Sequence, residues 1–141
     1  MTPLIMTNII ILKGERNSGK TITLRDYLPL QFDLRPPKRV FYYRGIKILV
    51  LNKSIHENKS WQDTINSITS LKYEIYIVAA WSDHLIQSSL HINRRVEDIL
   101  SERSGIFNFH EVFTEIVEPS QQESDHERCA QEIKMTIDGL A

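Results

Sequence analysis

The residues of this 141-residue chain with the clearest chemical potential lie in one short segment, residues 14–21 (GERNSGKT). The segment fits the pattern G-x-x-x-x-G-K-[ST] at every fixed position. In such a loop, Gly14 and Gly19 would adopt backbone angles that strain a Cβ, so that consecutive N–H groups converge on an anion. The Lys20 ammonium would face phosphate oxygens, and the Thr21 hydroxyl is suited to Mg²⁺. We call this segment the 14–21 loop, and its pattern predicts a phosphate-binding site.

The sequence on either side of the 14–21 loop predicts the strand and the helix that would position it. Residues 8–12 (NIIIL) are a continuous apolar run, typical of a strand buried on both faces. Residues 22–28 predict a helix that ends at Pro29. A helix that begins near Gly19 would direct the positive end of its dipole towards a bound phosphate. The residues expected to contact the ligand are Gly14, Glu15, Arg16, Asn17, Ser18, Gly19, Lys20 and Thr21.

Over residues 8–28 the chain resembles the P-loop nucleoside triphosphatase superfamily. The resemblance implies a parallel sheet, with Lys20 as the nucleotide contact and catalytic cation and Thr21 as the magnesium contact. The apolar pair 40–43 and 46–51 predicts an antiparallel hairpin with Gly45 in the turn. This hairpin is similar to the kinase–GTPase division of the superfamily, in which the third strand lies beside the P-loop strand.

Strand and helix patterns alternate along the whole chain, which predicts an α/β fold with a mostly parallel central sheet and helices on both faces. Further strands are expected at residues 73–80 and 112–117. Helical spacing of apolar residues is found at 61–68, 85–99 and 120–140. The stretches 29–39 and 52–60 are interpreted as loops within a single domain, residues 1–141.

Composition narrows the class of protein. With 41% hydrophobic and 25% charged residues and a net charge of −1, the chain is typical of a globular protein rather than a disordered one. Cys129 is the only cysteine, which excludes an intramolecular disulfide and a multi-cysteine zinc site. The apolar runs are too short to span a bilayer and no secretion peptide precedes them, so we expect a cytoplasmic protein without a membrane partner.

Phosphoryl transfer also needs a group that holds Mg²⁺ and orients the attacking atom. In the superfamily an Asp commonly ends the strand beside the P-loop strand, but here the third strand ends at the neutral Asn52. Asp83, just beyond the strand at 73–80, is the candidate for a catalytic or metal role, and capping of the following helix is the alternative. This departure predicts nucleotide binding with slow or partner-dependent hydrolysis.

The nucleotide is predicted to be ATP with Mg²⁺ rather than GTP. Asn52-Lys53 matches only the first half of the guanine-reading pattern N-K-x-D, because position 55 is Ile55. Without that carboxylate, the ring N–H and amino group of guanine lose their acceptor. The sequence therefore predicts an ATP-binding NTPase. Two alternatives stay open: a small-molecule or nucleotide kinase, and a nucleotide-dependent switch or interaction module with little turnover.

Two charged stretches raise the question of macromolecular partners. The segment from Arg35 to Lys47 holds five basic residues, no acid and three interleaved aromatic residues, as a single-stranded nucleic-acid surface would. An edge hairpin protected by charge is the alternative, and the slightly negative net charge favours it. Residues 111–127 hold six acids and no Lys or Arg, typical of a solvated face, or of a surface that meets the basic hairpin of another copy in a homo-oligomer. His84, His91, His110 and His126 lack zinc-site spacing and are interpreted as structural.

Overall fold

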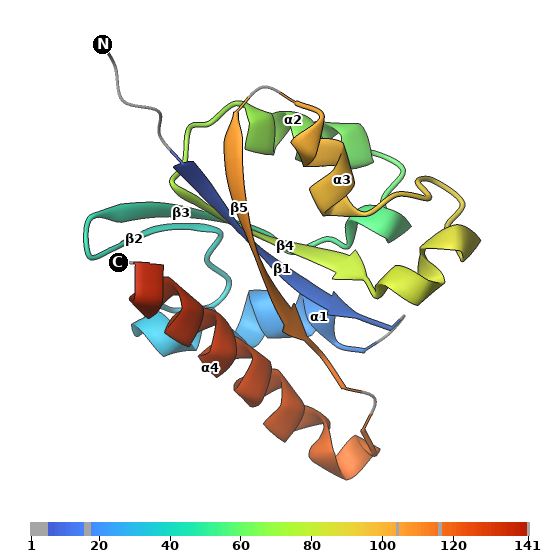
Figure 1. Cartoon of the computed structure of the whole chain (residues 1–141). Helices are drawn as coiled ribbons and strands as arrows, with labels where there is room; N and C mark the ends of the chain where they lie inside the picture. The colour runs from blue at the N-terminus through green and yellow to red at the C-terminus, as the bar shows by residue number, and fades with distance from the viewer. Residues whose placement is uncertain (1–5, 16–17, 104, 116, 141) are drawn as a thin grey trace.

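A computed structural model describes residues 6–15, 18–103, 105–115 and 117–140. Its centre is a five-stranded sheet with the strand order β2-β3-β4-β1-β5 (Figure 1). β1, β3, β4 and β5 run parallel, and β2 pairs antiparallel with β3. The strands are β1 (Met6–Gly14), β2 (Val40–Tyr43), β3 (Ile46–Leu51), β4 (Ile75–Trp81) and β5 (Ile106–Phe113). The mostly parallel α/β sheet and the hairpin are thus confirmed.

The hairpin turn follows from two residues with positive φ. Arg44 has φ 51° and Gly45 has φ 78°, the combination that a two-residue turn between twisted strands requires. Gly45 adopts this conformation without steric cost, as the sequence predicts.

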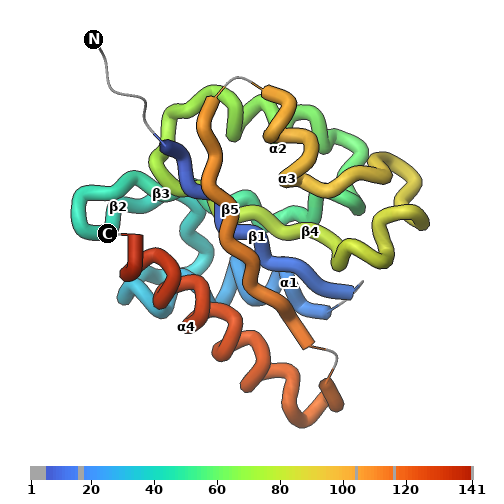
Figure 2. Tube along the Cα trace, viewed as in Figure 1, coloured from blue at the N-terminus to red at the C-terminus, as the bar shows by residue number. Residues whose placement is uncertain are grey.

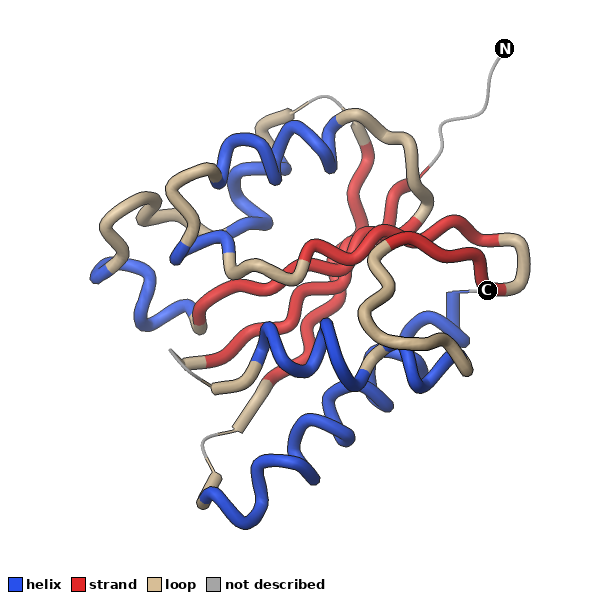
Figure 3. Tube along the Cα trace, turned by 180° about the vertical axis from the view of Figure 1, so that it is seen from behind, coloured by secondary structure: helices blue, strands red, loops and turns tan. Residues whose placement is uncertain are grey.

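Helices cover both faces of the sheet, as predicted (Figures 2 and 3). α1 (Lys20–Ile22) continues through a π-helical turn (Thr23–Tyr27) into a 3-10 turn (Pro29–Phe32). The other helices are α2 (Trp61–Thr69), α3 (Val96–Ser101) and α4 (Gln122–Leu140). Further 3-10 turns are Ile55–Glu57, Asp83–Ser88 and Pro119–Gln121.

β1 divides the interior into two cores, because successive side chains of a strand point to opposite faces. Ile10 and Leu12 pack with the α1 segment and α4, whereas Ile9 and Ile11 pack with α2 and α3. All four are fully buried, and each contributes about 1.5–3 kcal/mol of hydrophobic stabilisation. The strand that carries the 14–21 loop is therefore anchored from both sides.

The expectation that the third strand lies beside the P-loop strand is wrong, because β4 lies between β3 and β1. The burial of the strands is consistent with this order. All seven residues of β4 are buried, whereas β3 is only partly buried. This arrangement differs from the one that a resemblance to the kinase–GTPase division implies.

Two predicted elements have different bounds. The helix expected over 85–99 is wrong: a 3-10 turn ends at Ser88, and α3 begins only at Val96. The Ser89 hydroxyl donates to the His56 carbonyl at 2.8 Å and accepts from the Ile92 N–H at 3.3 Å, so local side-chain bonds compete with a helix here. The last strand lies at 106–113 rather than 112–117.

The polar residues of β5 explain why its pattern was missed. Asn108 and His110 interrupt the apolar run, and both bond to Asn8 on the neighbouring β1. Their partner is 100 or more positions away in sequence. Local periodicity therefore fails to mark the strand.

Candidate functional site

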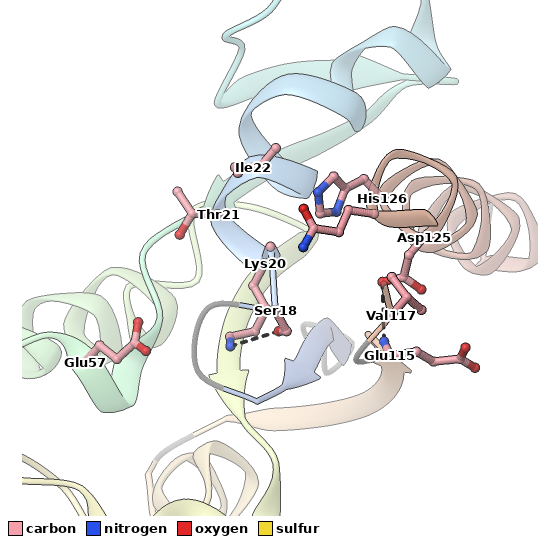
Figure 4. Close-up of a pocket in the computed structure, with 11 residues that line it drawn as sticks. Ser18, Lys20, Thr21, Ile22, Glu57, Glu115, Val117, Asp125 and His126 are labelled. Atoms are coloured by element: carbon pink, nitrogen blue, oxygen red, sulfur yellow. Dashed lines mark hydrogen bonds between the residues drawn. The ribbon is translucent and has the colours of Figure 1, made fainter. Parts of the chain in front are cut away.

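A cavity of about 370 Å³ lies at the end of β1, where the 14–21 loop meets α4 (Figure 4). In α/β sheets, ligands bind outside the carboxyl ends of the parallel strands, and this cavity has that location. One wall comes from the 14–21 loop and α1, and the other from the β5–α4 connection and α4. The lining residues are Ser18, Gly19, Lys20, Thr21, Ile22, Glu57, Glu115, Val117, Gln122, Asp125 and His126.

The two glycines of the 14–21 loop are required for different reasons. Gly19 is left-handed with φ 88°, and a Cβ there would lie 2.0 Å from Cε1 of His126. The predicted strained angle is therefore confirmed at Gly19. At Gly14 it is wrong, because Gly14 has no left-handed φ. A Cβ on Gly14 would instead lie 1.8 Å from Oγ1 of Thr114, so this position needs glycine for space.

Lys20 is a buried cation held by neutral groups. Lys20 is 4% exposed, and its Nζ donates to the carbonyl oxygens of Gly14 at 3.3 Å and Glu15 at 2.6 Å. The Nζ also donates to the Ser18 hydroxyl at 3.4 Å, the bond drawn in Figure 4. Across the described parts of the chain, no carboxylate forms an ion pair with it. Burial lowers the pKa of Lys20, and the charges of Glu57 and Glu15 only partly offset this. Among the described residues, the charged form therefore has no counter-ion in direct contact.

Thr21 connects α1 to the end of β3. Its hydroxyl donates to the Asn52 carbonyl at 3.1 Å. Although β3 is not next to β1, the chain just after β3 thus reaches the loop. Asn52 contributes its backbone to this contact.

Asp83 lies in a separate cluster of charges. Its carboxylate accepts from Lys13 Nζ at 2.8 Å and lies 3.5 Å from Arg95. Lys13 also bonds Glu97 of α3 at 2.8 Å, so the cluster faces α3. Burial would raise the pKa of Asp83, but Lys13 and Arg95 outweigh it and lower the pKa. Asp83 opens a 3-10 turn without a side-chain cap bond, and it does not line the cavity.

Glu57 is a cavity residue that the sequence analysis missed. It ends the 3-10 turn after β3, and its carboxylate accepts from Trp81 Nε1 at 2.9 Å. Its charge acts on Lys20 by raising the pKa of that ammonium. The signal that could have identified Glu57 is an acid a few residues beyond a predicted strand. Glu57 lies in the stretch 52–60, which the sequence led us to interpret only as a loop.

The β5–α4 side of the cavity was also missed. Asp125 is 6% exposed, so the interpretation of residues 111–127 as a solvated face is wrong at this position. Its carboxylate accepts from the Glu115 N–H at 3.3 Å and from Arg128 at 2.8 Å. His126 is hydrogen-bonded through Nδ1 to the Thr23 hydroxyl at 3.2 Å and packs on Tyr27. α4 thereby holds the π-helical turn that follows α1 in place.

The remaining predicted loop residues have mixed outcomes. Ser18 donates its N–H to the Glu15 carbonyl at 3.3 Å. The Glu15 carboxylate lies 2.9 Å from Nε2 of His84. Arg16 and Asn17, also predicted as ligand contacts, lie outside the described residues.

The basic stretch from Arg35 to Lys47 forms a loop and the β2–β3 hairpin at one edge of the sheet. Tyr42 is 68% exposed. The Arg44 guanidinium lies 5.1 Å from the Tyr43 ring, and Lys47 Nζ lies 4.7 Å from the Tyr73 ring. An edge position is what the alternative interpretation, a hairpin protected by its charges, requires. A nucleic-acid surface here stays a prediction.

No group of three or more His, Cys, Asp or Glu side chains is arranged to hold a metal ion in the described ranges. A phosphate-bound Mg²⁺ does not need such a group, because it takes most of its ligands from phosphate and water. Cys129 is buried, and burial raises the pKa of its thiol to about 12.

No family model, curated protein or solved structure matches the chain. Among the helices of the described residues, none has the length and apolar character to cross a membrane. The geometry of the cavity is therefore the observation from which a function follows.

Proposed function

We propose that this chain is a P-loop nucleotide-binding protein that takes a nucleoside triphosphate with Mg²⁺, ATP preferred, in the cavity beside the 14–21 loop. The observation that carries the proposal is Lys20, a buried ammonium at the cavity wall whose contacts among the described residues are carbonyl and hydroxyl oxygens. An uncompensated buried charge is costly, and a polyphosphate would supply the missing negative charge.

The residues of the cavity fit a magnesium–phosphate group. Gly19 has a left-handed backbone, the conformation that lets neighbouring N–H groups turn towards a bound anion. Thr21 presents a hydroxyl oxygen at the cavity wall, and Glu57 presents a carboxylate that can accept from metal-bound water. The cation would neutralise phosphate charge. The volume of about 370 Å³ lies in the range of small-molecule sites.

We propose slow or partner-dependent hydrolysis. Position 52 offers a carbonyl rather than a carboxylate. Glu57 is the carboxylate on that side of the cavity, and the Trp81 indole already holds one of its oxygens. The isolated protein should release phosphate well below the roughly 1–100 s⁻¹ typical of kinases.

A nucleotide-dependent switch is the second candidate, and one contact favours it. His126 joins α4 to Thr23 and stands directly over Gly19. Binding of a nucleotide at the 14–21 loop would therefore act on the position of α4, which packs across the sheet face through Ile133 and Ile137. The kinase alternative gains no comparable support.

The deciding experiment is calorimetric titration of ATP with Mg²⁺ into the protein and two variants. Lys20→Met keeps most of the buried stem and removes the ammonium, so we expect at least a hundredfold loss of affinity. Lys72→Met removes an exposed lysine that lies before β4, and should bind as the parent does. A folded Lys20→Met protein with parental affinity would overturn the proposal.

A further inference from the structure

β5 lies at one edge of the sheet, and no strand pairs with its outer side in the described parts of the chain. In Figure 1 it crosses the front of the sheet with no helix drawn over it. Just after β5, the Thr114 N–H donates to the Lys13 carbonyl of β1 at 2.8 Å, which fixes the orientation of the backbone. Backbone groups of successive residues point to opposite sides of a strand, so every second residue counted back from Thr114 faces β1. The outward-facing residues of β5 are therefore Phe107, Phe109, Glu111 and Phe113.

Three of these four residues have free backbone groups. The Phe113 carbonyl already accepts from Arg128 of α4 at 2.8 Å. Among the described residues, none donates to or accepts from the outward N–H and C=O groups of Phe107, Phe109 and Glu111. This stretch of backbone is therefore available to another strand.

The two edges of the sheet differ in how well they are protected. β2 has four residues and is flanked by Arg39 and Arg44, and shortness and positive charge both hinder pairing with another chain. β5 has eight residues, and Glu111 is its only Asp, Glu, Lys or Arg. Phe113 is 50% exposed and Ile106 is 39% exposed. β5 is thus the edge that favours association.

We propose that β5 pairs antiparallel with β5 of a second copy of this chain, which joins the two sheets edge to edge. A two-fold axis perpendicular to the sheet brings the same edge of both copies together. The three free residues all pair with one another in a single register, in which Phe109 lies opposite Phe109 of the second copy and Phe107 lies opposite Glu111. Other registers leave one of the three unpaired or require the Phe113 carbonyl, which Arg128 occupies. Each opposed pair then exchanges two backbone hydrogen bonds.

Side chains and charges fit this register. The Phe107 and Phe109 rings stack on the same face with centroids 6.3 Å apart, so the two Phe109 rings would meet at the axis as an aromatic cross-strand pair. The Glu111 residues of the two copies would be about 14 Å apart along the strands, beyond the screening length at physiological salt. Arg103 precedes β5 and Glu115 follows it, so antiparallel pairing brings these opposite charges to the same end.

Sedimentation velocity of the intact chain should show a dimer that dissociates on dilution. Phe109→Lys sets two like charges directly opposite each other across the axis, and should weaken the dimer at least tenfold. Phe107→Lys is the matched control. It also removes a ring from the same face, but it sets the lysine opposite Glu111 of the second copy and should keep the parental affinity. Circular dichroism checks that both variants are folded.

Cysteine cross-linking tests the register without depending on these charges. Phe109→Cys places two thiols on directly opposed residues, whose Cα atoms are about 5.5 Å apart, within the range of a disulfide. Phe107→Cys places them about 14 Å apart. Under mild oxidation only Phe109→Cys should form a disulfide-linked dimer, because the native Cys129 is buried.

Neither measurement needs a nucleotide, so the result is independent of the proposed function. A parent that stays monomeric at millimolar concentration would overturn the proposal. So would a Phe109→Lys dimer of parental affinity, or equal cross-linking of the two cysteine variants. Assemblies larger than a dimer would also overturn it, because they indicate a head-to-tail contact such as that between the basic hairpin and residues 111–127.

Discussion

Lys20 determines how the cavity responds to protons. Its folded-state pKa lies below the ordinary 10.5, mainly because burial destabilises the charged ammonium. The resulting cost to folding is fully present below the folded pKa, and disappears as the pH rises from that value through 10.5. A bound polyanion would stabilise the charged form and raise the pKa of Lys20 again.

Binding of ATP should therefore be linked to proton uptake at alkaline pH. At pH 9, Lys20 is deprotonated in a larger fraction of molecules than an exposed lysine would be. Binding of the nucleotide restores the proton. The calorimetric heat should then vary with the ionisation enthalpy of the buffer, more strongly at pH 9 than at pH 7. Lys20→Arg, whose guanidinium stays charged, should lose this dependence. Equal proton uptake at both pH values would contradict the assignment.

The metal-side carboxylate can be identified by a paired substitution. Glu57 lines the cavity, whereas Asp83 bonds Lys13 and Arg95. Glu57→Gln should raise the Mg²⁺ concentration needed for ATP binding about tenfold, as loss of an outer-shell partner does. Asp83→Asn should leave that concentration unchanged. The reverse pattern would restore the metal role that the sequence suggested for Asp83.

Gly19 should tolerate no side chain. In Gly19→Ala the new methyl would meet the His126 ring and hold a left-handed φ, and we expect a loss of about 1–3 kcal/mol in the free energy of unfolding. Urea denaturation measures it. The double variant Gly19→Ala/His126→Ala removes the clash but keeps the backbone strain. In the His126→Ala background, Gly19→Ala should therefore lower the free energy of unfolding by less than it does in the parent, but still measurably. Full stability of Gly19→Ala would be inconsistent with this geometry.

At the scale of elements, the end of β1 leads to the cavity on one side and carries a charged cluster on the other. Gly14 leads into the loop and the cavity, whereas Lys13, 2% exposed, points towards α3. Burial lowers the pKa of Lys13, but hydrogen bonds to Asp83 and Glu97 outweigh it and raise the pKa. The stability gained from Lys13 is thus fully present below pH 10.5 and is lost as the pH rises through the folded pKa.

Lys13→Met should be among the most destabilising substitutions on β1. It leaves the buried Glu97 with Arg95, 3.7 Å away, as its cationic partner, and loss of one partner of a buried ion pair costs about 3–5 kcal/mol. Lys134→Met breaks the more exposed pair with Asp138, and should cost much less than Lys13→Met because solvent screens that pair. Urea midpoints of the two variants measure the difference. Similar losses in both would show that the Lys13 cluster contributes no more than a surface pair.

The elements also show which features are readable from local sequence. The strand before the 14–21 loop and the β2–β3 hairpin are marked by apolar runs and a Gly45 turn, which act over a few residues. The order of the strands cannot be read from local sequence. It depends on which buried strand occupies the centre of the sheet, and periodicity does not encode this. For the same reason Glu57 was missed, since it joins Lys20 only through long-range packing.

At the scale of the whole molecule, ligand binding should appear as thermal stability. A ligand that binds only the folded state adds about 2.7 kcal/mol at one hundred times its dissociation constant. For a chain of this size each kcal/mol raises the melting temperature by about 2–4 °C. Thermal scans with Mg²⁺ should rank ATP above GTP, and Lys20→Met should show no shift. A larger shift with GTP would overturn the base preference.

The contact between His126 and Thr23 has a consequence for the growing polypeptide. The two residues are 103 positions apart, and His126, on α4, leaves the ribosome well after Thr23. The 14–21 loop is therefore synthesised long before the wall that completes its cavity. A nascent chain that ends before α4 should not retain nucleotide, so binding competence is acquired only once α4 has been synthesised.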